Sequence, residues 1–314
     1  MNGSSSARRR DVVVAVCTCR RPGPLRRLLD RLTEEAARSA SLVRVGVAIV
    51  DDGPAREAEA VADAFADRFE LGVRYSSTAS GNISTARNAA VDAAVALVGA
   101  LGWVCCIDDD CLPCDGWFDL LFAVRDATDA ELVTGPVHDV PPPGAPAWLT
   151  EQPFLNLIGD YDDLTEPPYG TAANMLVAAD WLLTHPEVRF RPELGRIGGE
   201  DMVWFADARA AGVVHRYAVR AEVTERLPPS RATMRYQVRS KLWFGNTMYV
   251  TNLEAGTPPG RLLLRGAKQF VTSIVRPLVR VAHGESPQVR SAVATAAIGV
   301  GLMSGRFGVR LDHH

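Results

Sequence analysis

Residues 103–114 read WVCCIDDDCLPC, an apolar run that ends in three consecutive aspartates. The run Trp103–Ile107 is short and uncharged, which predicts a buried strand. Three like charges in sequence repel one another unless a positive charge meets them. A divalent cation held by Asp108 and Asp110 would meet that need and leave ligand positions for phosphate oxygens. The alternative interpretation is a solvated acidic turn in which Asp115 caps the following helix.

The same strand-and-turn pattern recurs on the N-terminal side of this segment. Predicted strands cover residues 12–17, 45–50 and 73–75, and helical periodicity follows each of them. Strands that alternate with helices are typical of an α/β fold with a mostly parallel sheet flanked by helices. Because such sheets bind ligands at the carboxyl ends of their strands, we expect one ligand site along that edge.

The charge of the chain is divided unequally along its length. The 314 residues carry a formal net charge of -3. The stretch from Arg226 to Arg310 alone holds about +11, which leaves about -14 for the rest. An acidic body argues against nucleic acid as a partner, whereas a basic, partly apolar tail suits an anionic membrane surface or a phosphate-bearing acceptor.

The N-terminal residues 1–10 are rich in Ser and Arg, and no apolar run precedes the first predicted strand. They predict a disordered segment without a signal peptide. We therefore expect a cytoplasmic protein. Its basic tail could also bind it peripherally to the inner face of the membrane.

Further polar residues near predicted strand ends and helix starts are candidates for the site. Asp51 and Asp52 follow the second strand, and either could accept hydrogen bonds from a nucleobase or ribose; a polar turn explains them equally. Arg87 could pair with a diphosphate, although a solvated helix arginine is the plainer interpretation. Glu200 and Asp201 begin another helix, where they act either as N-terminal caps or as a general base.

Five motifs occur in an order that resembles family-2 glycosyltransferases of the GT-A fold, over residues 12 to about 245. They are VVVAVCTCRRP at 12–22, AIVDDG at 48–53, ARN at 86–88, IDDDCLP at 107–113 and GED at 199–201. Each motif alone is weak, and the resemblance depends on their order. It implies a GT-A-like α/β catalytic domain over residues 11–228, with a donor half at 11–135 and an acceptor half at 136–228. A basic helical C-terminal extension would follow at 229–314.

The resemblance also implies a role for each candidate residue. The residues implied in donor binding are Thr18, Arg20, Asp51, Asp52, Arg87, Asp108 and Asp109. The metal, Mn²⁺ or Mg²⁺, would be bound by Asp108, Asp110 and Glu225. The acceptor side would be formed by Gly170, Thr171 and Asn174. Asp201, with Glu200 beside it, is the candidate base that takes a proton from the attacking hydroxyl. The implied reaction is metal-dependent transfer of a sugar, with inversion, from a nucleotide-diphosphate sugar to an unidentified acceptor hydroxyl.

Three departures from the family pattern limit this transfer of roles. Cys19 replaces an aromatic residue that often stacks on the base, Ser80-Gly81-Asn82 replaces an Asn-x-Gly, and Glu225 occurs where many relatives have a metal-site His. The identity of the nucleobase is therefore open, and Glu225 is expected either to bind the metal or to leave that position to water. A nucleotidyltransferase and a non-catalytic binding protein of the same fold are the alternative functions.

The sequence from residue 231 onward predicts two or three amphipathic helices. Arg231, Arg235 and Arg239 recur every four residues, and the same spacing returns after residue 260. A solvated basic face explains this pattern, and so does peripheral contact with a membrane, because apolar residues lie beside the arginines. The apolar run 291–305 is shorter than the roughly 20 residues that a membrane-spanning helix needs.

Overall fold

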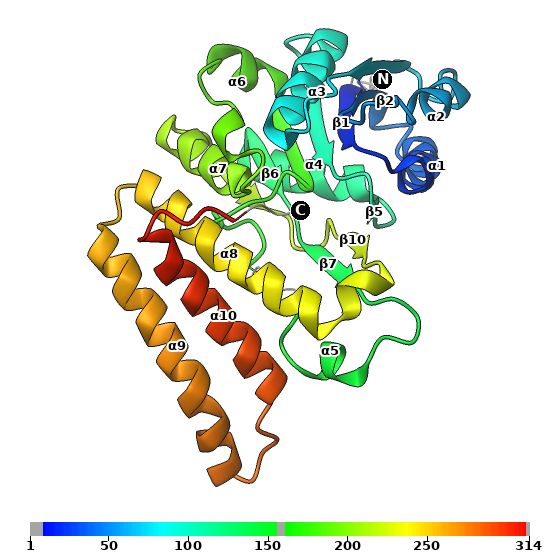
Figure 1. Ribbon diagram of the computed structural model, residues 1–314. Coiled ribbons are helices and arrows are strands. Elements are labelled where there is room, and N and C mark those ends of the chain that lie inside the picture. The colour runs from blue at the N-terminus through cyan, green and yellow to red at the C-terminus, as the bar shows by residue number, and fades with distance from the viewer. Residues whose placement is uncertain (1–8, 156–160, 312–314) are drawn as a thin grey trace. The chain divides into compact units, whose positions relative to one another are not determined.

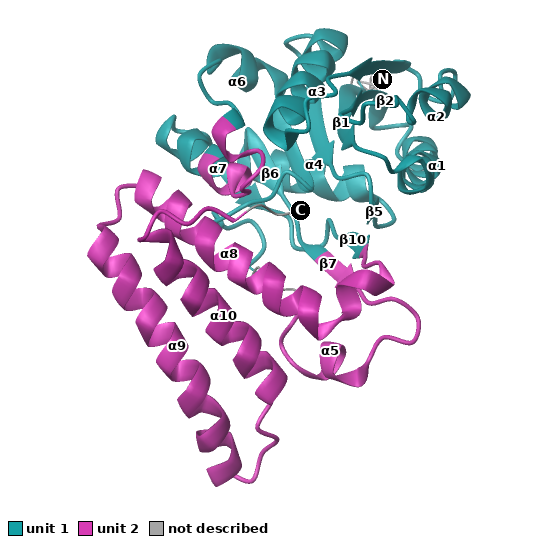
Figure 2. Ribbon diagram, in the orientation of Figure 1, with its two compact units in different colours: residues 1–137, 160–192, 204–225 teal, residues 138–159, 193–203, 226–314 magenta. Residues whose placement is uncertain are grey.

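The computed structural model describes residues 9–155 and 161–311 of the chain (Figure 1). These residues form two compact units, each built from separate stretches of sequence (Figure 2). Unit 1 contains the residues up to 137 together with 160–192 and 204–225, and unit 2 contains 138–159, 193–203 and the residues from 226 onward. Residues 1–8 of the segment expected to be disordered lie outside the described part, whereas Arg10 already begins the first strand.

A seven-stranded sheet forms the centre of unit 1. Its order is β3 (Val73–Ser77), β2 (Val43–Asp51), β1 (Arg10–Thr18), β4 (Trp103–Ile107), β8 (Asn174–Ala178), β6 (Leu132–Thr134) and β9 (His215–Tyr217). Neighbours from β3 to β4 are parallel, β8 is antiparallel to both of its neighbours, and β6 is parallel to β9. The predicted mostly parallel sheet is confirmed, with β8 as the reversed strand.

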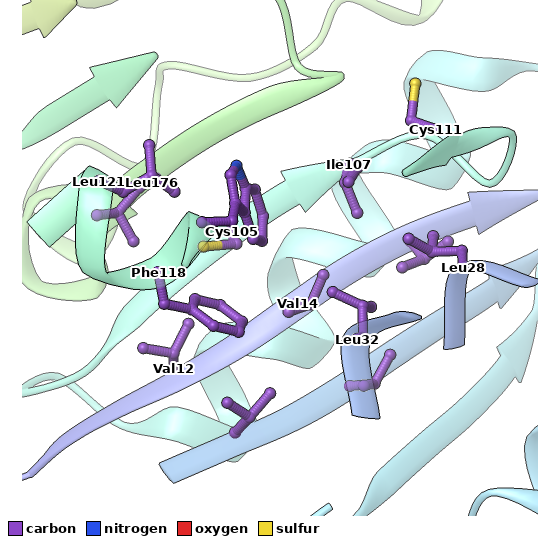
Figure 3. Close-up of a cluster of buried hydrophobic side chains, with 14 of the residues drawn as sticks. Val12, Val14, Leu28, Leu32, Cys105, Ile107, Cys111, Phe118, Leu121 and Leu176 are labelled. Carbon is purple, nitrogen blue, oxygen red and sulfur yellow. The ribbon is translucent and has the colours of Figure 1, made fainter. Parts of the chain in front are cut away.

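Helices cover both faces of this sheet. They are α1 (Pro22–Arg38), α2 (Glu59–Ala64), α3 (Ile83–Val98), α4 (Trp117–Thr128), α6 (Ala179–Thr184) and α7 (Glu200–Ala210). Because successive strand residues point to opposite sides, Val12, Val14 and Val16 join an apolar cluster with α1, α2 and α4. Figure 3 shows Val12 and Val14 of this cluster together with Leu28 and Leu32 of α1 and Phe118 and Leu121 of α4. Val13 and Ala15 join a second cluster with α3, α6 and α7. The predicted flanking helices are therefore confirmed.

A short three-stranded sheet has the order β5 (Cys111–Pro113), β10 (Val223–Arg226) and β7 (Val137–Val140). Strand β5 begins directly after the three aspartates and pairs antiparallel with β10. This pairing brings the segment around residue 225 beside the end of the aspartate run, although the two are far apart in sequence.

Helix α4 is capped from a different part of the chain than the sequence suggests. The interpretation of Asp115 as its N-cap is wrong, because the N-cap residue is Gly116 and it provides no side-chain acceptor. Instead Oε2 of Glu35, a fully buried residue of α1, accepts hydrogen bonds from the backbone N–H groups of Gly116 (2.7 Å) and Trp117 (3.1 Å). Two orphan donors at the helix start are thereby satisfied through tertiary structure.

Unit 2 is mainly helical. It contains α5 (Ala147–Glu151), α8 (Met234–Glu254), α9 (Pro259–Ala282) and α10 (Val289–Gly305). Helix α10 packs against both α8 and α9. The approach is close: a Cβ atom at Gly266 of α9 would lie 2.9 Å from the carbonyl oxygen of Gly299, and one at Gly245 of α8 would lie 2.1 Å from that of Ile298. The Ala/Gly-rich run 291–305 is thus a packing helix, and the predicted helical C-terminal region is confirmed.

Candidate active site

The three aspartates follow β4 at the carboxyl end of the central sheet, beside the end of β1. The register of β1 and β4 is parallel, so the residues that follow the two strands meet at the same edge. Thr18, the last residue of β1, donates a hydrogen bond of 2.6 Å from Oγ1 to Oδ2 of Asp109. Asp109 is only 4% exposed. The first and fourth motifs are therefore joined by a buried side-chain contact.

Arg21 supplies a positive charge to this cluster and was not among the predicted site residues. Its Nη1 donates to Oδ1 of Asp109 (3.2 Å) and to Oδ2 of Asp110 (2.7 Å). The preceding residue, Arg20, is the one predicted from the sequence to bind the donor. It is exposed and has a backbone φ of +56°. The sequence gives two adjacent arginines, and only the turn after β1 decides which of them reaches the aspartates.

Arg87, in the second turn of α3, lies beside the aspartates, and its predicted contact with a diphosphate stays a prediction. Its Nη2 donates to Oδ1 of Asp108 at 3.1 Å, and its guanidinium carbon lies 5.7 Å from the centre of the Phe190 ring. The side chain of Arg87 is 12% exposed, whereas that of Asp108 is 38% exposed. The aromatic ring and the carboxylate together hold the guanidinium at the edge of the sheet.

The electrostatics of the cluster follow from burial and from its two arginines. Burial raises the pKa of Asp109 to about 7, against the opposing effects of the Thr18 hydrogen bond and the Arg21 guanidinium. Asp108 and Asp110 each accept from an arginine. Three carboxylates and two guanidinium groups thus occupy one small region, and an incoming cation or diphosphate would exchange with these internal ion pairs.

Glu225 lies at the same edge through the pairing of β10 with β5. It is the register partner of Cys111, the residue that follows Asp110. Burial is the largest of the effects that raise the pKa of the Cys111 thiol, and the negative charges of Asp108, Asp110 and Glu225 add to it. Within the described part of the chain, no three His, Cys, Asp or Glu residues are arranged as a metal site. The oxygen donors themselves are of the kind that Mg²⁺ and Mn²⁺ prefer.

Asp51 and Asp52 organise the loops that flank the site. Oδ1 of Asp51 accepts from the backbone N–H of Gly53 (2.8 Å), and its Oδ2 accepts from that of Ala58 (3.0 Å). Asp52 accepts from the residues before α3, namely Thr78 Oγ1, Ser80 N and Oγ, Gly81 N and Asn82 N. Because Asn82 in turn caps α3 by accepting from the N–H of Thr85, Asp52 fixes the start of the helix that carries Arg87. Their predicted contact with the nucleotide stays a prediction.

The predicted acceptor-side residues of unit 1 lie in and beside the start of β8. Asn174 is fully buried, and its Nδ2 donates to the carbonyl oxygens of Ala221 (2.7 Å) and Pro136 (2.9 Å) while its Oδ1 accepts from Trp117 Nε1 (3.0 Å). The structure thus gives Asn174 the role of joining three chain segments, and its acceptor role stays a prediction.

The neighbouring residues Gly170 and Thr171 are tied to the local backbone and to α7. A Cβ atom at Gly170 would lie 2.4 Å from the ring of Phe205, so glycine is needed for this close approach. Oγ1 of Thr171 accepts from the N–H of Ala173 at 3.2 Å. Their contact with an acceptor also stays a prediction.

Glu200 and Asp201 follow a glycine turn that is held by α8 of unit 2. Gly198 and Gly199 have φ values of +79° and +86°. A Cβ at Gly198 would meet the ring of Trp243 at 2.1 Å, and Trp243 Nε1 donates to the carbonyl oxygen of Ile197 at 2.8 Å. Glu200 and Asp201 then form the first turn of α7. The candidate base therefore depends on a C-terminal helix for its position.

Comparison with known proteins points to one family. Residues 13–182 match the family described as Glycosyl transferase family 2. The chain is 27% identical over 235 residues to the succinoglycan biosynthesis protein ExoM of Rhizobium meliloti (strain 1021), covering 74% of this chain and 72% of that protein.

Solved structures similar to this chain include S. aureus TarS. The chain matches one TarS structure with a TM-score of 0.54 and 14% identity, over 78% of this chain and 39% of TarS. It matches TarS 1-349 in complex with UDP-GlcNAc with a TM-score of 0.52 and 17% identity, over 78% of this chain and 66% of that chain. At these identities the likeness shows a shared fold. In the part of this chain that the structure describes, no helix is both long and apolar enough to cross a membrane.

Proposed function

The chain belongs to glycosyl transferase family 2, and on that premise we propose that it transfers a sugar from a nucleotide-diphosphate sugar to an acceptor hydroxyl. The observation that carries the proposal is the cluster of Asp108, Asp109 and Asp110 with Arg21 and Arg87 at the carboxyl edge of the sheet. TarS, which shares the fold, has been solved with UDP-GlcNAc and with UDP. Membership of this glycosyltransferase family argues against the alternative function of a nucleotidyltransferase.

We propose that the diphosphate of the donor lies against this cluster. Asp108, Asp110 and Glu225 would hold Mg²⁺ or Mn²⁺, which would neutralise the charge that grows on the diphosphate as it leaves. Arg87 would release Asp108 and donate hydrogen bonds to a phosphate oxygen. Asp109, hydrogen-bonded to Thr18, would fix the aspartate run relative to β1.

The acceptor reaction is assigned to the first turn of α7. Asp201, with Glu200 beside it, would accept the proton of the acceptor hydroxyl as its oxygen attacks the anomeric carbon, and that direct displacement would invert the configuration. The named role of ExoM in succinoglycan biosynthesis supports a saccharide hydroxyl as the acceptor. The cytoplasmic location expected from the sequence belongs to the same proposal.

The experiment that tests the donor site is calorimetric titration of UDP, GDP and TDP with and without Mn²⁺. We expect one nucleotide to bind in a metal-dependent way, and Asp110→Asn to lose that binding because one metal carboxylate is gone. Asp30→Asn, an exposed aspartate of α1, is the matched control and should bind like the unaltered chain. Absence of binding by all three nucleotides would contradict the donor site, and binding without sugar transfer would favour a non-catalytic protein.

A further inference from the structure

Helix α9 contacts α10 through a narrow face only. The residues of α9 that are buried in the described structure are Leu262, Gly266 and Ser273. Leu262 belongs to an apolar cluster with Tyr249 and Leu302. At 100° per residue these positions lie on one side of the helix, so most of the circumference of α9 faces away from α10.

An apolar stripe covers much of that outward surface. The exposed large apolar side chains are Leu263 (36%), Leu264 (71%), Phe270 (37%), Val271 (55%), Ile274 (56%), Val275 (47%), Leu278 (67%), Val279 (48%) and Val281 (57%). Leu264, Val271 and Leu278 recur every seven residues and therefore mark the centre line of the stripe. Scattered exposed apolar residues are ordinary, but a continuous row along one helix indicates an interaction surface.

Basic residues border this apolar stripe, and few acidic residues lie near them in the sequence. The exposed residues Arg261, Arg265 and Lys268 recur at helical spacing, so they lie on one side of α9. That side adjoins Leu264 and Val275 of the stripe. Between residues 259 and 305 the sequence has a single acidic residue, Glu285. Its carboxylate pairs with Arg280 at 2.9 Å. In the described part of the chain no carboxylate pairs with Arg261, Arg265 or Lys268, so one side of the stripe carries exposed positive charge.

We propose that the outward face of α9 docks on the surface of an anionic lipid bilayer, with the helix lying flat at the interface. An apolar row bordered by Arg and Lys is the pattern of an interfacial helix, because the row enters the acyl boundary while the cations meet anionic headgroups. A second copy of the chain is a poorer occupant, since two α9 faces would bring basic borders together without carboxylates to meet them. The 24-residue helix offers a contact about 36 Å long.

The test is sedimentation of the full-length protein with vesicles, either of phosphatidylcholine alone or containing about one third phosphatidylglycerol. We expect binding to the anionic vesicles and at least about tenfold weaker binding to the neutral ones, because each basic residue near the surface contributes about 1 kcal/mol. Leu264→Glu combined with Leu278→Glu should lower binding to anionic vesicles at least about tenfold. Both side chains are more than half exposed, so the double variant should fold.

The matched control is Leu101→Glu combined with Leu183→Glu, at exposed leucines of unit 1, which should bind vesicles like the unaltered chain. Equal loss in both double variants, or no binding to anionic vesicles by the unaltered chain, would overturn the proposal. A dimer in sedimentation velocity that Leu264→Glu with Leu278→Glu converts to a monomer would assign the face to a second copy instead. Nucleotide titration of the same variants separates this result from the donor site, because α9 contributes none of the proposed donor residues.

Discussion

Arg21→Gln is expected to make the proposed metal site bind Mn²⁺ more tightly. In the structure the guanidinium of Arg21 lies 2.7 Å from Asp110 and 3.2 Å from Asp109. A metal ion held by Asp110 would therefore lie within about 5 Å of this cation and be repelled by it. With a charge of +2 on the metal and an effective dielectric constant of 40 to 80, the repulsion at that distance is about 1.5 to 3 kcal/mol. The side chain of Arg21 is 43% exposed, so we expect the lower figure, which corresponds to about tenfold tighter binding.

The assay is calorimetric titration of Mn²⁺ into the protein without nucleotide. Arg21→Lys retains the charge and should bind Mn²⁺ within about twofold of the unaltered chain if the effect is electrostatic. Arg27→Gln, at an exposed position of α1, is the control for removing a charge elsewhere. If Arg21→Gln binds Mn²⁺ equally or more weakly, Arg21 does not compete with the metal and the reasoning fails.

Three further predictions concern positions away from the aspartate run. Asn174→Ala would leave Trp117 Nε1 and two carbonyl groups without their buried partner, so it should lower the free energy of unfolding in urea by about 3 to 5 kcal/mol; a loss below about 1 kcal/mol would contradict the joining role. Gly199→Ala places a Cβ 2.6 Å from Thr247 at a φ of +86°, and we expect it to abolish most sugar transfer while nucleotide affinity stays unchanged, so equal turnover would refute the dependence of Asp201 on this turn. Burial lowers the pKa of His215 from 6.5 to about 3. The unfolded chain therefore takes up a proton below pH 6.5 that the folded chain does not, and stability that is present above pH 7 should fall by about 2 kcal/mol by pH 5. His215→Gln should remove that part of the pH dependence in urea unfolding, and an unchanged difference between the two pH values would show that another group causes it.

The sequence predicts the positions of the strands and helices of unit 1 well, because the pattern of apolar residues along each element reflects which of its residues are buried. The run 12–17 and the aspartates after Ile107 lie where the continuous apolar runs and their lengths place them. Three of the five family motifs, at residues 12–22, 48–53 and 107–113, span the end of a strand, so the same local pattern supports the family resemblance. Sheet order and the reversed β8 need long-range pairing, which local pattern does not contain.

The side-chain partners within the site are much less predictable. Nothing in the sequence separates Arg20 from Arg21, because the choice depends on a backbone turn with positive φ. Asp115 is of a residue type that often caps helices, yet the backbone N–H groups at the start of α4 are bound by Glu35 of another helix. Asp52 accepts five hydrogen bonds from the segment that precedes α3, more than 25 residues further along the chain, which its residue type does not reveal. In each case a tertiary contact, rather than residue type, decides the role.

The turn before Glu200 has a consequence for how the protein is made on the ribosome. Residues 193–203 belong to unit 2, and the turn rests on Trp243 and Thr247 of α8, both of which donate to the carbonyl oxygen of Ile197. The turn therefore emerges from the ribosome before the helix that supports it. At roughly 5 to 20 residues per second, the wait for α8 lasts several seconds. During translation, the candidate base would thus reach its final position only after α8 has been synthesised, and the sugar transfer proposed for it could begin only then.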